Sequence, residues 1–348
     1  MTVEKHEFGS TADGSAVGLF VIDTENGYRL TLTNYGARIV SLLTPDRRGD
    51  SAEVTLGFNE LGPYLEPNPY YGATIGRYAN RIAGGTFRLG MKTFRLACNE
   101  GPNHLHGGHQ GFDRQLWSAE LIGDSDFAGV RFARVSKDKE ERYPGRLTVE
   151  LEITLNTSGD LRLRYTAETT KTTPVNLTNH AYFNLAGPDS VSILNHRLDA
   201  SAAYYLPVDE NAIPTGEMRE VAGTAFDFSR SKALGDEIDS IPGGYDHCMV
   251  FSTSEPVREL RPVAQVYDPD SGRRMEVLTT KPGMQLYTGN KLAGSFDRHR
   301  GKLPARSAFC LETQHFPNAM NEQSFPQPLL DPNQTYQHET VYRFSAQR

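Results

Sequence analysis

One stretch, Arg146–Leu155 (RLTVELEITL), restricts the fold more than any other part of the chain. Its apolar residues alternate strictly with polar ones, so an extended strand here has one apolar face and one polar face. A second alternating run, Leu161–Tyr165, follows the turn-forming sequence NTSGD at Asn156–Asp160. The two runs predict an antiparallel β-hairpin with one face in a hydrophobic core.

Short alternating runs recur through the chain, whereas helical periodicity is almost absent. We expect further strands at Gly18–Asp23, Arg29–Thr33, Arg38–Leu43, Val130–Ser136, Arg274–Thr279 and Val341–Phe344. A short helix is expected at Ser229–Ile238 and a turn or two at Phe58–Tyr64. No strand–helix–strand rhythm, fixed repeat or low-complexity linker is present. The sequence predicts an all-β protein, a large antiparallel β-sandwich that forms a single domain over residues 1–348.

Composition narrows the class of partner. The 348 residues carry a formal net charge of −7, which argues against nucleic acid as the main partner. The N-terminus has no apolar signal segment, and no run approaches the ~18 apolar residues that cross a bilayer. The three cysteines form no CxxC pair, so neither a disulfide framework nor a zinc knuckle is indicated. We therefore expect a cytoplasmic protein with no membrane partner.

The segment Pro174–Gly187 (PVNLTNHAYFNLAG) is unusually rich in polar side chains. His180 and Tyr182 share a face of an extended strand, and together they suit a proton donor with a hydrogen-bonding neighbour. The alternative is that both are satisfied polar residues of a β core. The asparagines of this segment are expected to be structural ties: Asn176, Asn179 and Asn184.

A matching base stands in the segment Phe309–Asn318 (FCLETQHFPN). Glu312 is a single carboxylate in a strand pattern, and a partly buried carboxylate is costly unless it has partners or a chemical role. The alternative is a glutamate that binds backbone at the end of a strand. If ionised Glu312 lies near His180, we expect it to raise the pKa of His180 and a cationic His180 to lower that of Glu312.

Four other short segments and one loop carry candidate ligand-binding groups. The spacing of His104 and His106 in NHLHGG places both histidines on one face if the segment is extended. That pattern suggests a metal site, but the glutamate of cupin-type sites is missing, so we expect no metal. The alternative is one catalytic or sugar-binding histidine and one structural histidine. The long aromatic loop Asn59–Tyr71 is of a kind that is often functional. The remaining polar candidates are Arg77, Asn80 and Arg81 in GATIGRYANRI, Asp246 in GYDHCMV and Gln285 in GMQLYTGN.

No phosphate loop, nucleophile elbow, flavin or nicotinamide fingerprint is present. The candidate groups instead suit proton transfer on a neutral, polyhydroxylated ligand. At the same segments the sequence resembles the aldose 1-epimerases, also called galactose mutarotases. The matching segments lie in family order and span nearly the whole chain; they include NYGARIVSLLTPDRRG (Asn34–Gly49), GATIGRYANRIAGGTF, NHLHGG, VNLTNHAYFNLAG, GYDHCMVF, GMQLYTGN and FCLETQHFPNAMN.

The resemblance implies a fold, an activity and a set of roles. It implies a β-supersandwich of the galactose mutarotase type with an open sugar cleft, no cofactor and a monosaccharide substrate whose α and β anomers are interconverted. It implies His180 as general acid and Glu312 as general base. It assigns sugar binding to Asn80, Arg81, His106, Tyr182, Asp246 and Gln285. The chain departs from the family pattern at Ala225, where proline is usual, and at Cys248, where asparagine is common. We expect a monomer or a homodimer.

Three rival functions share parts of this pattern. A non-catalytic sugar-binding module would use the hydroxyl-binding residues alone, but an aromatic platform would be expected and Trp117 is the only tryptophan. A glycoside hydrolase would need two carboxylates, a role that Asp246 and Glu312 could take. A hexose-6-phosphate epimerase would need a basic cluster at the matching segments, and none is evident.

Overall fold

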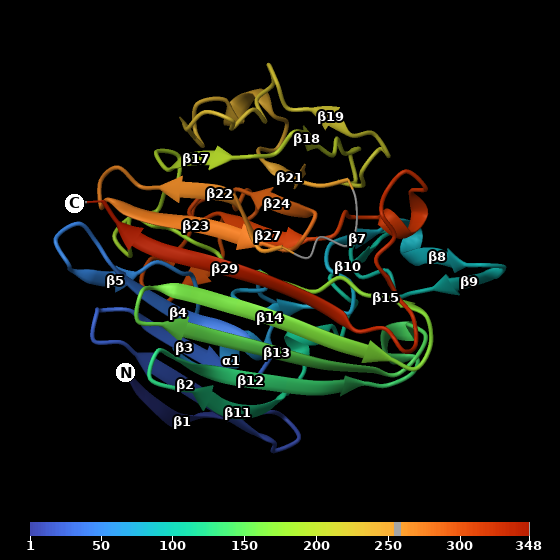
Figure 1. Ribbon diagram of the computed structural model, residues 1–348, viewed down its shortest axis with the longest axis horizontal. Helices are drawn as coiled ribbons and strands as arrows, with labels where there is room; N and C mark the ends of the chain where they lie inside the picture. The colour runs from blue at the N-terminus through green and yellow to red at the C-terminus, as the bar shows by residue number, and fades with distance from the viewer. Residues whose placement is uncertain (254–258, 348) are drawn as a thin grey trace.

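The computed structural model describes residues 1–253 and 259–347, and the regular secondary structure of this part of the chain consists mostly of antiparallel strands (Figure 1). The all-β expectation is confirmed. The strands within these two ranges form two five-stranded sheets, one nine-stranded sheet and several two-stranded pairs.

The first sheet is a meander of consecutive strands from the N-terminal part of the chain. Each strand pairs with the next in sequence, as the short Gly-, Asn- and Asp-containing turns between them allow. The strands are β1 (Thr2–Ser10), β2 (Ala16–Asp23), β3 (Arg29–Thr33), β4 (Arg38–Pro45) and β5 (Ser51–Glu53).

The nine-stranded sheet contains the predicted hairpin. The strands β13 (Leu147–Asn156) and β14 (Asp160–Thr169) pair in antiparallel register, with Leu151 opposite Tyr165, so this prediction is confirmed. Next to β14 lies β29 (Tyr336–Ala346), which also pairs with β23 (Arg273–Thr279). The sheet is completed by β11 (Ser118–Gly123), β12 (Phe127–Ser136), β22 (Arg261–Tyr267), β17 (Arg197–Ala200) and β20 (Lys232–Ala233).

The third sheet carries most of the polar candidates of the C-terminal half. Its strand order is β19 (Arg219–Glu220), β18 (Tyr204–Tyr205), β21 (Asp246–Val250), β24 (Gly283–Tyr287) and β27 (Cys310–Gln314). In β27 every residue is buried, which is typical of a strand covered on both faces.

The remaining elements are short. The pairs are β6 (Thr74–Ile75) with β16 (Thr178–Asn179), β7 (Arg81–Ile82) with β10 (His104–Leu105), β8 (Thr86–Leu89) with β9 (Lys92–Arg95), β15 (Thr173–Pro174) with β28 (Leu329–Leu330), and β25 (Phe296–Asp297) with β26 (Gly301–Lys302). Helical turns are α1 (Gly62–Leu65) and the 3-10 turns η1 (Ala83–Gly85), η2 (Phe112–Arg114), η3 (Glu140–Arg142), η4 (Ile238–Ser240) and η5 (Ala319–Asn321). The hairpin β8–β9 projects from the body of the molecule (Figure 1). No helix in the described ranges has the length or the apolar run that a membrane span requires.

The helix expected at Ser229–Ile238 is wrong. Residues 232–233 form the edge strand β20, whose Leu198–Lys232 register joins it to β17. The carboxylate of Asp236 accepts a hydrogen bond from the backbone N–H of Ala233, which closes a turn and stops any helix there. The helical turn expected at Phe58–Tyr64 is found as α1, displaced toward the end of that segment.

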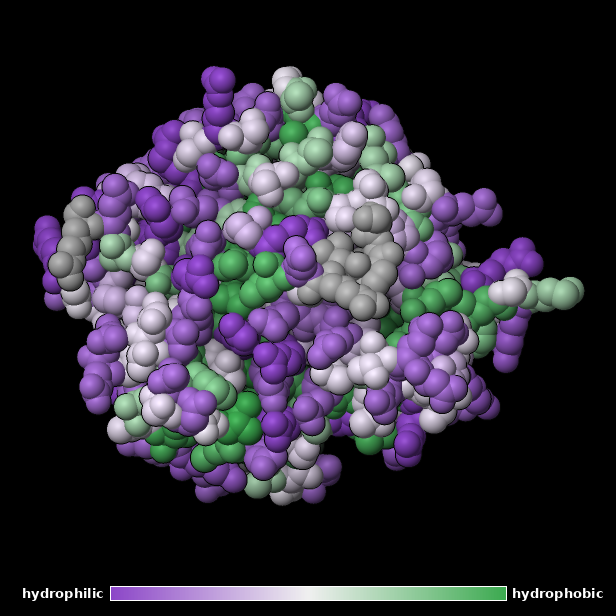
Figure 2. Space-filling model, viewed as in Figure 1, coloured by the Kyte–Doolittle hydropathy of each residue, from purple (hydrophilic) through white to green (hydrophobic). Residues whose placement is uncertain are grey.

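One hydrophobic core joins the three large sheets. It contains Leu32 of β3, Leu151 of β13 and Met284 of β24, all fully buried. This shared core supports the proposal that the chain is one domain. On the face drawn in Figure 2, hydrophilic residues cover most of the surface and hydrophobic residues appear in smaller patches between them.

Gly72 lies where the first sheet meets the segment that contains His180. Its N–H donates to the carbonyl of His180 at 3.0 Å, and its carbonyl accepts from the N–H of Ile39 at 3.0 Å. Its φ is +63°, and a Cβ at this position would lie 1.8 Å from the carbonyl oxygen of Ile39. Only glycine fits both the conformation and the space.

Replacement of Gly72 should therefore destabilise the whole fold. We expect Gly72→Ala to lower the free energy of unfolding by about 2–5 kcal/mol, because left-handed strain and overpacking add. The control is Gly84→Ala, at φ +60° with no atom within 4 Å of the new Cβ. Urea unfolding of both variants measures the difference, and equal losses would show that the contact with Ile39 has no energetic consequence.

Candidate active site

A cleft of about 430 Å³ opens beside the third sheet. The sequence-predicted site residues all line it, although they come from distant segments: Asn80, Arg81, His106, His180, Tyr182, Asp246, Gln285 and Glu312. The structure thus brings the predicted acid, base and hydroxyl-binding groups together at one place.

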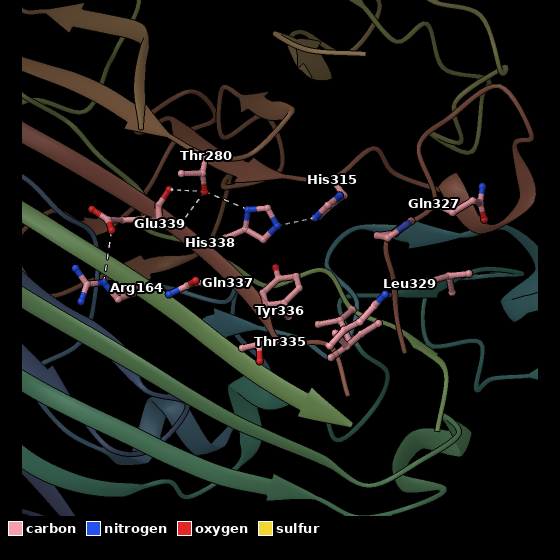
Figure 3. A pocket seen from close by; sticks show the side chains of 14 residues that line it. Arg164, Thr280, His315, Gln327, Leu329, Thr335, Tyr336, Gln337, His338 and Glu339 are labelled. Carbon is pink, nitrogen blue, oxygen red and sulfur yellow. Dashed lines mark hydrogen bonds and ion pairs between the residues drawn. The ribbon is translucent and has the colours of Figure 1, made fainter. Parts of the chain in front are cut away.

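A larger cavity of about 920 Å³ lies elsewhere (Figure 3). Several of its polar lining residues contact one another: Thr280 Oγ1 lies 3.1 Å from His338 Nδ1, and His338 Nε2 lies 3.3 Å from His315 Nε2. Arg164 forms an ion pair with Glu339 at 3.5 Å. The larger cavity is lined by neither His180 nor Glu312, whereas the smaller cleft is lined by both.

His180 and Glu312 form a close, buried pair. His180 Nε2 lies 3.6 Å from Glu312 Oε1, and the two side chains are 6% and 3% exposed. Two backbone hydrogen bonds hold His180 in place, from its own N–H to the carbonyl of Ala73 at 2.8 Å and from the N–H of Gly72. Glu312 is fixed by the ladder between β27 and β24, where it lies opposite Gln285.

Burial controls the protonation of this pair. It lowers the pKa of His180 to about 3, and the nearby cation of Arg38 acts in the same direction. It raises the pKa of Glu312 well above its ordinary value, with the negative charge of Asp246 as a further cause. The expectation that the pair would raise the pKa of His180 and lower that of Glu312 is therefore wrong. The reason is that desolvation outweighs the attraction between the two groups.

Tyrosine rings enclose the imidazole of His180. Tyr182 stacks on it with 4.8 Å between ring centroids, which bears out the predicted shared face. Tyr70 also stacks on it, at 5.8 Å, and meets His106 edge-on at 4.9 Å. Tyr70 was not identified from the sequence, although it lies in the long aromatic loop 59–71. The only tryptophan, Trp117, is buried in the core, so tyrosines supply the aromatic lining of the cleft.

The two histidines of NHLHGG separate, so their predicted shared face is wrong. His106 has a φ of +53°, so the segment is not extended there and the side chain of His106 points away from that of His104. His104 is structural: its Nδ1 contacts the carbonyl of Ala97 and its Nε2 the hydroxyl of Tyr143, both at 2.7 Å. His106 instead faces the cleft, 5.4 Å from His180 between ring centroids.

The protonation of His106 is fixed by the backbone. Its Nδ1 accepts a hydrogen bond from the N–H of Asn80 at 3.1 Å. Burial lowers the pKa of His106 well below its ordinary value. A neutral imidazole that accepts at Nδ1 carries its hydrogen on Nε2. His106 is therefore a hydrogen-bond donor toward the cleft.

This hydrogen matters for metal binding. His106, His180 and Glu312 offer ligand atoms that lie within 4.8 Å of one another. A cation needs a lone pair from each ligand, whereas Nε2 of His106 carries a hydrogen because Nδ1 is occupied. The spacing resembles a metal site, but the donor set does not fit one.

Arg81 is held by a residue that the sequence did not reveal. Its Nε and Nη2 donate to the two carboxylate oxygens of Glu100 at 2.7 and 2.6 Å. This paired geometry fixes the plane of the guanidinium and leaves its other N–H groups for the cleft. Nothing in the sequence links positions 81 and 100, because the contact depends on the short pair β7–β10.

Asp246 is oriented by a chain of amides. Gln285 Nε2 donates to Asp246 Oδ1 at 2.7 Å, and Gln285 Oε1 accepts from Gln314 Nε2 at 3.3 Å. Gln285 thus positions the carboxylate as well as lining the cleft.

Other polar residues of the candidate segments are structural. Arg77, a candidate ligand-binding group in the sequence, is buried and donates to the carbonyls of Pro144 and Gly145 at 2.9 and 3.0 Å, and it does not line the cleft. The three asparagines tie backbone together as expected: Asn176 to Ala79, Asn179 to Gly72 and Asn184 to Ser307.

The fold and the cleft define a large β-sandwich protein with a buried histidine–glutamate pair facing a polar cleft. The Aldose 1-epimerase family model matches residues 18–343. The chain is 44% identical to galactose mutarotase of Sus scrofa over 99% of each chain, and 46% identical to that of Homo sapiens over 91% of each. It is 34% identical to aldose 1-epimerase of Escherichia coli (strain K12), over 96% of this chain and 97% of that one.

Solved structures agree with these relatives. An aldose epimerase homologue from C. elegans superimposes with a TM-score of 0.87 at 28% identity, covering 96% of this chain and all of that one. A galactose 1-epimerase from Lactobacillus acidophilus NCFM gives 0.85 at 26% identity, with both chains fully covered. The chain belongs to the aldose 1-epimerase family.

The metal argument can be tested by calorimetry. Titration of zinc chloride into the protein should give no binding that depends on the cleft, because Nε2 of His106 has no free lone pair. The wild-type protein and Glu312→Gln should therefore show the same heats. A stoichiometric signal that disappears in Glu312→Gln would place a cation at these residues.

Proposed function

We propose that the protein is an aldose 1-epimerase that interconverts the α and β anomers of free aldohexoses such as glucose and galactose. The observation that carries this proposal is the buried His180–Glu312 pair, 3.6 Å apart, in a cleft lined by hydroxyl-binding groups. Membership of the family supports it, since relatives over nearly the whole chain are named galactose mutarotase and aldose 1-epimerase.

The reaction needs one acid and one base. Ring opening breaks the bond between C1 and the ring oxygen O5, which leaves readily only when it is protonated. At the same time the hydroxyl on C1 must lose its proton to become the aldehyde. In this proposal His180 protonates O5 and Glu312 accepts the proton of O1, and each transfer is typically worth about 10²–10⁴ in rate. Rotation about C1–C2 and reversal of both transfers then close the ring on the other face.

The cleft is suited to holding both anomers. In this proposal Arg81, Asp246 and Asn80 bind the hydroxyl groups far from C1. C1 itself has to be bound less tightly, because its configuration changes during the reaction. His106 presents its Nε2–H beside His180 and would donate to the ring oxygen. Glu312 Oε2 is buried and has no hydrogen-bond partner among the described residues, which suits an atom that receives a substrate hydroxyl.

A non-catalytic sugar-binding module would not need this arrangement. Such a module uses hydroxyl-binding groups, whereas a desolvated carboxylate with an unsatisfied oxygen is costly unless it has a chemical task. The organisation as a single domain, the lack of a cofactor, a cytoplasmic location and a monomeric or homodimeric state stay predictions from the sequence.

The role of Glu312 is tested by Glu312→Gln, which keeps the shape of the side chain and removes the base. We expect mutarotation to fall by about 10²-fold or more. Polarimetry of freshly dissolved α-D-glucose and α-D-galactose measures the rate above the spontaneous background. Calorimetry should show that galactose still binds, because the hydroxyl-binding groups remain. Near-normal mutarotation by this variant would exclude Glu312 as the base.

Glu100→Gln tests the positioning of Arg81. Loss of the charge should free the guanidinium, so we expect KM to rise about tenfold, equivalent to about 1.4 kcal/mol, with kcat changed much less. The matched control is Glu120→Gln, which weakens an exposed ion pair to Arg131 at the edge of the nine-stranded sheet. If both variants have the KM of the wild-type enzyme, Glu100 does not position the guanidinium for binding.

A further inference from the structure

The imidazole of His180 has an unusual partner at its second nitrogen. Cys310 Sγ lies 3.5 Å from His180 Nδ1, while Nε2 faces Glu312. Cys310 is fully buried and stands two residues before Glu312 on β27, so both side chains point to the same face of the strand. Burial raises the pKa of the Cys310 thiol well above its ordinary value, so the sulfur is present as a neutral thiol.

A thiol sulfur is a weak hydrogen-bond acceptor. A histidine that must stay cationic usually has a carboxylate or carbonyl oxygen at the nitrogen that faces away from the substrate. Here the sulfur lies at that nitrogen. Burial lowers the pKa of His180 and outweighs a hydrogen bond to the backbone of His180 itself, which raises it, so a positive charge on the ring has little net support.

The carboxylate of Glu312 is equally unsupported. Its Oε2 receives no hydrogen bond among the described residues, and its Oε1 has His180 at 3.6 Å. Burial and the negative charge of Asp246 raise the pKa of Glu312 and outweigh the charge of Arg81, which lowers it. The guanidinium of Arg81 is itself paired with both oxygens of Glu100. An ionised carboxylate needs hydrogen-bond donors, and no residue in the described ranges donates to Oε2 of Glu312.

The other charged and titratable groups around His180 do not change this balance. Arg38 is a buried cation and opposes a second positive charge. His106 is neutral, and Tyr70 and Tyr182 contribute uncharged rings because burial raises the pKa of both phenols. Asp246 and Glu100 are further carboxylates that line the cleft, and the negative charge of Asp246 disfavours ionisation of Glu312.

We propose that Cys310 is a positioning residue that keeps His180 neutral in the sugar-free enzyme, so that the one exchangeable proton of the pair rests on Glu312. In this state Nδ1–H points to the sulfur, and the protonated carboxyl group of Glu312 lies beside the unprotonated Nε2, with Oε1 3.6 Å away. The inference rests on the proposed function in taking His180 and Glu312 as the acid–base pair. The lowered pKa of His180 and the raised pKa of Glu312 agree with it.

The protonation states of His180 and Glu312 in the sugar-free enzyme are the same as those in the complex with the open-chain aldehyde. When a cyclic sugar binds, its hydroxyls donate to Glu312 and the proton passes from the carboxyl group to Nε2 of His180. Glu312 then takes the proton of O1, His180 gives its proton to O5, the C1–O5 bond breaks and the C1=O1 bond forms. The pair is neutral again while the aldehyde is present. The protonation state of the sugar-free enzyme therefore matches the one needed by the open-chain intermediate and not the one needed by the cyclic sugar.

Nitrogen NMR of the sugar-free protein tests the proposal directly. With ¹⁵N-labelled histidine, and His180 assigned by its loss in His180→Gln, a neutral ring with hydrogen on Nδ1 is expected between pH 5 and 8, a range of about three units around the ordinary histidine value. An imidazolium with hydrogen on both nitrogens at pH 7 would overturn the proposal.

Substitution of Cys310 tests its role. Cys310→Asn places a carbonyl acceptor at Nδ1 and should raise the pKa of His180 by about one unit or more, and Cys310→Asp should raise it further. The acid limb of the kcat/KM profile should move in the same direction. Cys248→Asn, at a buried cysteine on β21 that lies opposite Gln285, is the matched control and should leave the NMR titration of His180 unchanged. If Cys310→Asp fails to fold, Cys310→Asn alone decides. An unshifted His180 in a folded Cys310→Asn protein would refute the role of Cys310.

These readouts separate this proposal from the proposed function. The NMR state of His180 is measured without turnover, whereas mutarotation is measured by polarimetry. A neutral His180 in a protein without mutarotase activity would support the proposed protonation state and would refute the proposed function. An imidazolium at pH 7 in an active mutarotase removes the proton placement and keeps the function.

Discussion

The antiparallel pairing of β21, β24 and β27 is the interaction on which the cleft depends. Its register sets Gln285 opposite Glu312 and Asp246 opposite Tyr287. Side chains alternate along each strand, so a slip of one residue would turn Glu312 into the core and bring Leu311 or Thr313 to the cleft. The hydrophobic residues Met284 and Leu286, buried in the main core, oppose such a slip. The core thus fixes the chemistry through the backbone, without touching the reacting atoms.

The second constraint is desolvation. A histidine and a carboxylate that lie side by side in water form an ion pair at neutral pH. In this buried site the free-energy cost of removing water from the two charges is larger than their electrostatic attraction. Tyr70 and Tyr182 exclude water from the imidazole, and no described residue donates to Glu312 Oε2. Substrate hydroxyls would supply those hydrogen bonds, which links the protonation of the pair to occupancy of the cleft. The fixed donors of the cleft, such as His106 held by the N–H of Asn80, need no such adjustment.

Much of the fold and of the candidate site can be predicted from the sequence, and the reasons are physical. Strict alternation in Arg146–Leu155 predicts the hairpin β13–β14 because a period of two belongs to strands alone. The site residues stand out as polar groups in apolar strand patterns, and the family resemblance supplies their roles. Tyr70, Glu100 and Cys310 were missed because their importance comes from partners far away in the chain. The shared face of His104 and His106 failed since a positive φ at a histidine leaves no mark in the sequence. The helix at Ser229–Ile238 failed since a local Asp236 turn and pairing with β17 override weak periodicity.

The position of β29 has a consequence for how the chain is made. This strand, residues 336–346, lies between β14 and β23 in the middle of the nine-stranded sheet (Figure 1). On the ribosome, β11 to β14 are complete long before their neighbour exists, so the backbone groups along one edge of β14 stay unpaired until the last strand emerges. An open edge of this length invites pairing with other chains. The two halves of the nine-stranded sheet can pair only after synthesis has reached β29. A nascent or truncated chain without β29 would therefore be a substrate for chaperones and not a smaller folded protein.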